Sequence, residues 1–150
     1  MIEEQTQQCA LIVEDEGMTV LLLKRALTRG GYEVVGAVPD GGQAIVAART
    51  LKPDFIIMDI NMPRMNGIEA TRQIIAERHV PIVMLTAYSD EALVEEASTA
   101  GACAYLVKPL TVDQIIPAAC TALANSRKSC GAAPTLTPLV VLYQTCLVVL

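Results

Sequence analysis

The chain has 150 residues, of which 53% are hydrophobic and only 3% aromatic, and its formal net charge is −5. This length fits one domain with a sizeable core, and the negative charge excludes a general basic surface of the kind that binds nucleic acid. The five cysteines form no Cys-x-x-Cys pair, which argues against a disulfide framework or a zinc site. Residues 1–8 are polar and acidic and have no signal-peptide pattern. We therefore expect a soluble, cytoplasmic protein.

Short apolar runs alternate along the chain with segments of helical spacing. Buried strands are predicted at Cys9–Val13, Glu33–Val38, Phe55–Met58, Ile82–Thr86 and Ala104–Val107. Helices are predicted at Met18–Arg29, Gly42–Thr50, Gly67–Arg78, Asp90–Ala100 and Val112–Ala124. This alternation predicts an α/β fold. We expect a flavodoxin-like, doubly wound, five-stranded parallel sheet of order 2-1-3-4-5 with five helices.

Polar side chains stand where four of these strands end. Glu14 and Asp15 follow the first strand, Asp59 the third, Thr86 ends the fourth, and Lys108 follows the fifth. In the expected strand order these ends are neighbours at the edge where open α/β sheets bind ligands. Converging carboxylates need a cation, and hard oxygen ligands in a partly open site suit Mg²⁺. A carboxylate nucleophile beside a lysine and a hydroxyl is what an incoming phosphoryl group requires.

Each residue alone has a simpler explanation. Acids at 14–16 are favoured at a helix N-terminus by its dipole, and Asp59 could cap the following turn. Thr86 could simply end a strand, Lys108 could be solvated, and His79 is expected to be a loop residue. The combination on neighbouring strand ends favours the functional interpretation.

Four motifs resemble the receiver domain of bacterial two-component response regulators. They are LIVEDE at Leu11–Glu16, IIMDINMPRMNG around Asp59, MLTA around Thr86 and AYLVKP around Lys108. The resemblance extends from about residue 9 to residue 124. Within that family the chain is most similar to receivers of the antiterminator (ANTAR) type, through the stretches GYEVVGAVPDGGQAI, PIVMLTAYSDEALVEEASTAGACAYLVKPL and IIPA.

The resemblance implies a switch in which Asp59 accepts a phosphoryl group from a sensor histidine kinase or a phosphotransfer protein. It implies Mg²⁺ bound by Asp15, Asp59 and the backbone carbonyl of Asn61, with Glu14 acting through water. Such a domain catalyses its own phosphorylation and dephosphorylation rather than working as a conventional enzyme. It then acts on a downstream target protein.

The resemblance also implies how the phosphoryl group would be sensed. Thr86 and Lys108 would bind its oxygens, Thr86 and Tyr105 would form the switch, and the Lys108–Pro109 peptide bond would be cis. Tyr105 could instead be an ordinary half-buried strand residue. The responding surface would consist of the helix at Asp90–Ala100, the strand at Ala104–Val107 and the helix at Val112–Ala124.

Three other functions are weighed against this one. A pseudo-receiver, which is a protein-interaction module that is not phosphorylated, would usually lack an acid, the lysine or the acceptor aspartate, and all are present. A flavin binder needs a phosphate cradle after the first strand, where Glu14–Glu16 would repel a phosphate. A phosphatase of the haloacid dehalogenase kind has a second aspartate two residues after its nucleophile, where Asn61 stands.

Residues 126–150 depart from ANTAR-type regulators, which continue into a long helix and an RNA-binding output domain. Pro134 and Pro138 interrupt a continuing helix, and no charged residue follows Lys128. The apolar run Leu139–Leu150 is too short for a transmembrane helix, which needs ~20 residues. We therefore expect a receiver domain at 1–125, and a Pro-containing linker and apolar tail at 126–150. The tail could dock on the domain, join a homodimer, lie at a membrane surface or be a non-native terminus, and no direct nucleic acid binding is expected.

Overall fold

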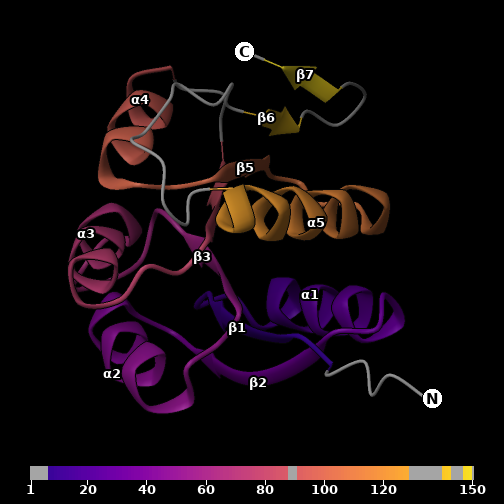
Figure 1. The fold of residues 1–150 in the computed structure, drawn as a ribbon, viewed down its shortest axis with the longest axis horizontal. Helices are drawn as coiled ribbons and strands as arrows, with labels where there is room; N and C mark the ends of the chain where they lie inside the picture. Colours follow the sequence, from indigo (N-terminus) through magenta and orange to yellow (C-terminus); the bar gives the residue numbers. More distant parts are fainter. Residues whose placement is uncertain (1–6, 88–90, 129–139, 143–146, 150) are drawn as a thin grey trace.

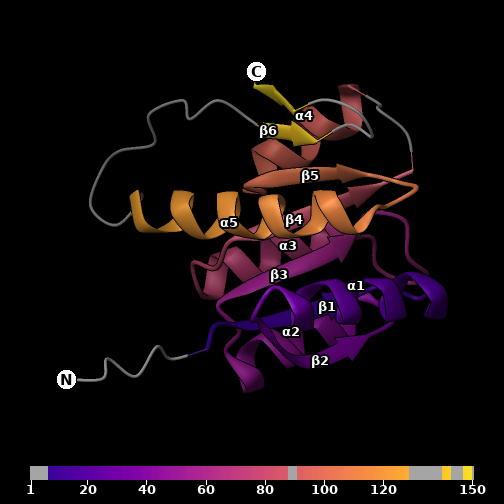
Figure 2. The same ribbon diagram turned by 90° about the vertical axis from the view of Figure 1, so that its right-hand side faces the viewer.

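The structure is a computed structural model that describes residues 7–87, 91–128, 140–142 and 147–149. In chain order its elements are β1 (Cys9–Val13), α1 (Gly17–Arg29), β2 (Glu33–Val38), α2 (Gly41–Leu51), β3 (Phe55–Asp59), α3 (Gly67–Glu77), β4 (Ile82–Thr86), α4 (Glu91–Ala100), β5 (Ala104–Val107), α5 (Val112–Lys128), β6 (Val140–Leu142) and β7 (Leu147–Val149). A central sheet lies between two layers of helices, with α1 and α5 on one face and α2, α3 and α4 on the other (Figures 1 and 2).

The sheet confirms the predicted order and adds to it. Strands β2-β1-β3-β4-β5 are all parallel and follow the order 2-1-3-4-5. The predicted five-stranded parallel sheet is therefore confirmed, and two short strands of the tail, β6 and β7, extend it beyond β5. Strand β6 pairs parallel with β5, and β7 pairs antiparallel with β6. The physical reason is that the apolar tail supplies β-prone backbone to an edge with unpaired hydrogen-bonding groups.

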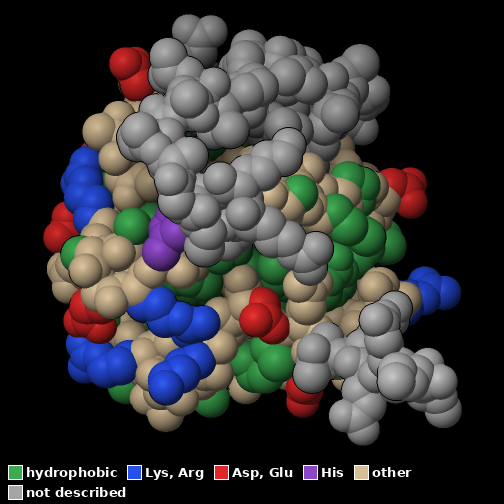
Figure 3. Space-filling view, in the orientation of Figure 1, with side chains coloured by type: hydrophobic (Ala, Val, Ile, Leu, Met, Phe, Trp, Pro, Cys, Tyr) green, Lys and Arg blue, Asp and Glu red, His purple; other side chains and the backbone are tan. Residues whose placement is uncertain are grey.

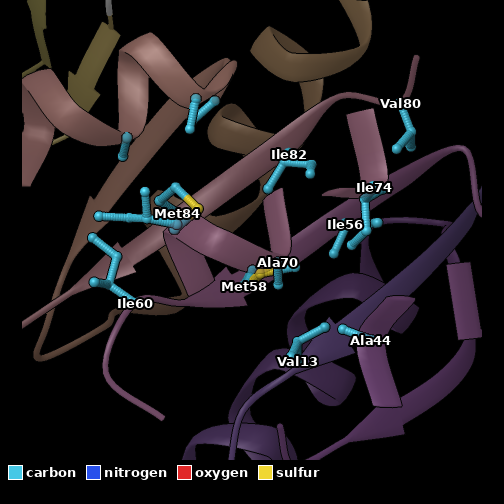
Figure 4. Packing of buried hydrophobic residues seen from close by; sticks show 14 of the residues in the cluster. Val13, Ala44, Ile56, Met58, Ile60, Ala70, Ile74, Val80, Ile82 and Met84 are labelled. Carbon is cyan, nitrogen blue, oxygen red and sulfur yellow. The ribbon is translucent and has the colours of Figure 1, made fainter. Parts of the chain in front are cut away.

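Strand alternation divides the core into two clusters. Leu11, Ile56, Met58, Ile82 and Met84 pack with α2, α3 and α4, as Figure 4 shows for most of this cluster. Their neighbours in the strands pack instead with α1 and α5. No residue is shared between the two clusters. All five residues of β3 and all five of β4 are buried, as expected for strands covered on both faces.

The helix ends follow local capping chemistry. Asp40, predicted to cap α2, accepts a hydrogen bond from the backbone N–H of Gln43 at 2.8 Å. The α5 helix continues one turn beyond the expected end at Ala124, to Lys128, because no helix-breaking residue interrupts 125–128. Helix α5 also contains Pro117, which is exposed and has no N–H to donate within the helix. The expected cap of α4 at Ser89 or Asp90 lies outside the described residues.

Charges of both signs lie intermixed over α2 and α3 (Figure 3). Arg49 binds Glu77 through two hydrogen bonds of 2.6 and 3.0 Å, and Arg72 lies 3.5 Å from Glu69. These two arginines are therefore matched by acids, as on an ordinary solvated surface. Within the part of the chain that the structure describes, no helix is long and apolar enough to cross a membrane.

Candidate functional site

The predicted site residues meet at the carboxyl ends of the parallel strands. Asp59 ends β3 beside Leu85, and Thr86 ends β4 beside Val107. The backbone N–H of Lys108, just after β5, donates to the carbonyl oxygen of Thr86 at 2.7 Å. The sheet register thus brings together side chains that lie far apart in the sequence. His79 follows α3 in a loop before the amino end of β4, as expected.

Three carboxylates form the centre of the site. One oxygen each from Glu14, Asp15 and Asp59 can be chosen such that all three lie within 4.8 Å of one another. Glu14 and Asp59 are 3% and 4% exposed, whereas Asp15 is exposed. The cluster therefore has two acids held in the protein and a third at its solvent side, which fits a partly open cation site.

Lys108 bridges the two buried acids. Its Nζ lies 2.7 Å from Glu14 Oε2 and 3.2 Å from Asp59 Oδ2. Burial by itself lowers the pKa of Lys108, but the hydrogen bond to Glu14 and the charges of Asp59 and Glu14 outweigh it, so this pKa lies above its usual value. Lys108 is therefore a fixed positive charge beside the Asp59 carboxylate.

Glu14 is the most strongly perturbed acid of the site. Burial, followed by the charge of Asp59, raises the pKa of Glu14 to about 7, although Lys108 and the backbone N–H of Glu16 at 3.1 Å both lower it. One lysine does not fully compensate the two buried carboxyl groups. An added cation would relieve the remaining repulsion by favouring the ionised form of Glu14.

The loop after β3 holds the Asp59 carboxylate in place. The backbone N–H of Asn61 donates to Asp59 Oδ1 at 3.2 Å, and the N–H of Gly67 donates to the carbonyl oxygen of Ile60 at 2.9 Å. A Cβ at Gly67 would overlap the carbonyl oxygen of Asp59. Glycine is therefore required here by close backbone approach. From the sequence Gly67 is predicted only to begin a helix, because nothing local reveals which backbone comes near it.

A second restraint on this loop was missed from the sequence. Arg64, in left-handed conformation with φ 72°, places its guanidinium 3.5 Å from Asp40 Oδ2. Asp40 thus caps α2 and also contacts the loop that follows β3. An ion pair across two loops has no sequence signal beyond the presence of the two charges.

Thr86 and Tyr105 lie inside the protein. Thr86 is 1% exposed, and Tyr105 is fully buried rather than half-buried. The Tyr105 hydroxyl donates to the backbone carbonyl of Val94 in α4 at 2.9 Å, and burial, with a smaller effect of Cys103, raises its pKa. Tyr105 therefore connects β5 directly to α4. The Lys108–Pro109 peptide bond is cis.

Buried strand-end acids bridged by a lysine, on a doubly wound sheet of order 2-1-3-4-5, define the receiver class of signalling domains. The model of the response regulator receiver domain family matches residues 10–119. The chain belongs to this family, which confirms the resemblance seen in the four motifs.

Individual relatives agree with this assignment. The chain is 47% identical over 118 residues to the transcriptional regulatory protein PdtaR of Mycobacterium tuberculosis, covering 79% of this chain and 58% of PdtaR. It therefore spans less than two thirds of that relative's length. It is 38% identical over 109 residues to the chemotaxis protein CheY of Thermotoga maritima, covering 72% of this chain and 91% of CheY.

Solved structures show the same fold. A two-component response regulator of the LuxR family from Aurantimonas sp. SI85-9A1 superposes with a TM-score of 0.76 at 30% identity, covering 80% of this chain and 87% of that chain. A CheX–CheY complex with BeF3 and Mg²⁺ from Borrelia burgdorferi gives a TM-score of 0.72 at 28% identity, covering 75% of this chain and 86% of that chain.

Proposed function

We propose that this chain is a Mg²⁺-dependent phospho-accepting switch whose acceptor is Asp59. The observation that carries the proposal is the double contact of Lys108 with Glu14 and Asp59 inside a cluster of three carboxylates. An ordinary surface cluster of acids would not be buried around one lysine. The phosphoryl donor is a sensor histidine kinase or a phosphotransfer protein, as for two-component receivers in general.

The donor set fits Mg²⁺. Asp15 and Asp59 would bind the ion directly with the backbone carbonyl of Asn61, and Glu14 would act through water. The raised pKa of Glu14 agrees with this assignment, because burial and then the charge of Asp59 disfavour the ionised form, which a bound cation would favour. Bound Mg²⁺ would neutralise charge on the oxygens of the incoming phosphoryl group.

The two oxygens of Asp59 have different environments. Oδ1 accepts from the N–H of Asn61, and Oδ2 faces Lys108. In the transfer a carboxylate oxygen of Asp59 forms a bond to phosphorus while the bond from phosphorus to the donor nitrogen breaks. The donor histidine leaves as a neutral imidazole once it takes up a proton. Lys108 lies close enough to exchange its contact with Asp59 for one with a phosphoryl oxygen, and Thr86 supplies a hydroxyl from the neighbouring strand end.

The switch would run from Thr86 and Tyr105 to the surface made by α4, β5 and α5. To shift the ratio of the responding to the resting conformation from 1:99 to 99:1, phosphorylation has to stabilise the responding conformation by roughly 5.5 kcal/mol more than the resting one. Charge-assisted hydrogen bonds contribute ~1.5–3 kcal/mol each. Because Lys108 already contacts Glu14 and Asp59, its net gain is smaller than this gross value. Thr86 therefore has to supply a substantial share, which agrees with its position between the acceptor and Tyr105.

Intact-mass measurement after incubation with Mg²⁺ and acetyl phosphate tests the proposal. The wild-type chain should gain one phosphoryl group, and Asp59→Asn should gain none. Asp54→Asn is the matched control, because Asp54 stands at the other end of the same strand and accepts a hydrogen bond from Cys9. Uptake by Asp59→Asn under the same conditions would show that Asp59 is not the acceptor.

Two further variants separate chemistry from switching. Lys108→Ala should impair both phosphorylation and the response, whereas Thr86→Ala should still be phosphorylated but should respond poorly. Backbone amide shifts with and without beryllofluoride report the response at α4, β5 and α5. Shifts confined to the loops around Asp59 would leave a phosphoryl carrier without a switch. The responding surface would bind a downstream target protein or a second copy of the chain, and direct nucleic acid binding is not part of the proposal.

A further inference from the structure

The edge of β5 that faces away from β4 is occupied by the chain's own tail. Ala104, Tyr105 and Leu106 pair with Val140, Val141 and Leu142 of β6, in parallel register. Backbone groups alternate in direction along a strand. The N–H of Lys108, just after β5, donates to Thr86 of β4, so the N–H groups of Leu106 and Ala104 also face β4 and that of Tyr105 faces β6.

The connection that brings β6 to this edge has the opposite hand from the other crossovers. The step β1–α1–β2 moves toward one edge of the sheet, and β5–α5–β6 moves toward the other, yet α1 and α5 cover the same face (Figures 1 and 2). Steps β3–α3–β4 and β4–α4–β5 move across the sheet in the opposite direction from β1–α1–β2, and their helices cover the opposite face. Because direction and face are both reversed, these steps have the same hand as β1–α1–β2. About 98% of such crossovers are right-handed, and β5–α5–β6 is left-handed.

Because right-handed crossovers are strongly preferred, the hand of this one does not help to place β6 beside β5. What holds β6 is its pairing over three residues with β5 and three with β7, which is short for a strand. The whole stretch from Ser129 to Leu150 contains no charged residue, although charges are a common protection of natural sheet edges. The affinity of β6 for this edge thus comes from backbone pairing of an uncharged, β-prone segment, and not from the way the chain is connected.

We propose that the outer edge of β5 is a binding site for an extended, uncharged, β-branched peptide segment, and that the hairpin of β6 and β7 occupies it reversibly. Addition of a strand to a sheet edge is a general mode of peptide recognition. The inference rests on strand pairing and topology, and it stands whether or not Asp59 is phosphorylated. A partner segment of the same chemistry would bind this edge only after the hairpin has left.

Hydrogen exchange of the wild-type chain, followed by NMR, tests reversibility. The amide of Tyr105 should exchange through local opening, at least about tenfold faster than the amides of Ala104 and Leu106 and the amides of β3. Equal exchange of Tyr105 and the β3 amides would make β6 an integral strand and would overturn the proposal.

A complementation experiment tests the binding site itself. Leu142→Pro removes the N–H of β6 that faces the carbonyl of Tyr105 in this register, whereas Leu142→Ala keeps it and serves as the control. Tyr105 should lose protection in Leu142→Pro only, with the amides of Ala104 and Leu106 unchanged. A synthetic peptide of residues 138–150, extended with lysines for solubility, should restore protection when added to Leu142→Pro, and the same peptide carrying the proline should not.

Each remaining outcome decides against the proposal. Global unfolding of Leu142→Pro would show that the hairpin is part of the fold rather than a removable occupant. Unchanged Tyr105 protection in Leu142→Pro would show that the hairpin does not cover this edge. Failure of the wild-type peptide to restore protection would show that the edge has no affinity for a separate strand.

Discussion

Replacing Glu14 with glutamine tests the electrostatics of the acidic site, because the amide keeps the size of the carboxyl group but cannot ionise. Burial and the charge of Asp59 raise the pKa of Glu14 from 4.5 to about 7 in the folded chain. Between these values the folded state binds more protons than the unfolded state. The stability that this proton contributes is fully present below 4.5 and is lost as the pH rises through about 7.

The size of the effect follows from the two pKa values. One pKa unit corresponds to about 1.4 kcal/mol. Because the Glu14 side chain is 0% exposed, screening by solvent does not reduce the effect. In metal-free buffer, the unfolding free energy of wild type minus that of Glu14→Gln should fall by up to about 3 kcal/mol across the interval from 4.5 to about 7.

Urea unfolding of both chains, followed by circular dichroism in the presence of a chelator, measures this difference. Subtracting the two curves cancels the titration of carboxyl groups that the chains share. Saturating Mg²⁺ should flatten the difference, because a bound cation favours the carboxylate form. A metal-free difference that stays constant or increases with pH would refute the assignment of Glu14 as an acid kept protonated by burial.

Two further substitutions probe the backbone and the switch. Gly67→Ala should lower the unfolding free energy by ~1–3 kcal/mol, because the new Cβ overlaps the carbonyl of Asp59. Gly17→Ala, at the equivalent first position of α1 with nothing within 4 Å, should be neutral or stabilising by up to ~1 kcal/mol, and equal losses in urea unfolding would contradict the overlap. Tyr105→Phe should cost ~1–2 kcal/mol, since it leaves the carbonyl of Val94 without this donor. It should also reduce beryllofluoride-induced amide shifts in α4, and unchanged shifts would exclude Tyr105 from the switch.

The strands and the site could be predicted from the sequence because both depend on local patterns. An apolar β-branched run that stops at an acid, as at Asp59, identifies a strand and its functional end at once. Strand order then follows from the small number of topologies that parallel sheets allow. The meeting of Asp59, Thr86 and Lys108 required no knowledge of side-chain packing.

The direct contact between Lys108 and Glu14 could not be predicted in the same way. Glu14 is drawn into the sheet because its backbone N–H bonds the carbonyl of Val38, which extends the β1–β2 pairing by one residue beyond the strand. The strand with which the apolar tail pairs could not be predicted either. The segment Val140–Leu142 could pair with any unpaired strand edge or pack on any apolar surface. Such non-local choices depend on competing partners, and a single sequence does not rank them.

The separation of the core into two clusters has a consequence for how this domain tolerates change. A substitution at Ile57 alters packing against α1 and α5, whereas one at the adjacent Met58 alters packing against α2, α3 and α4. Residues without shared partners contribute additively to stability. We therefore expect non-additive effects on stability between substitutions within one cluster, but not between substitutions in different clusters. The residues on the two faces of the sheet can therefore change in evolution at different rates. A compensating substitution should be found on the same face as the substitution that it compensates, even when the adjacent residues in the chain lie on the opposite face.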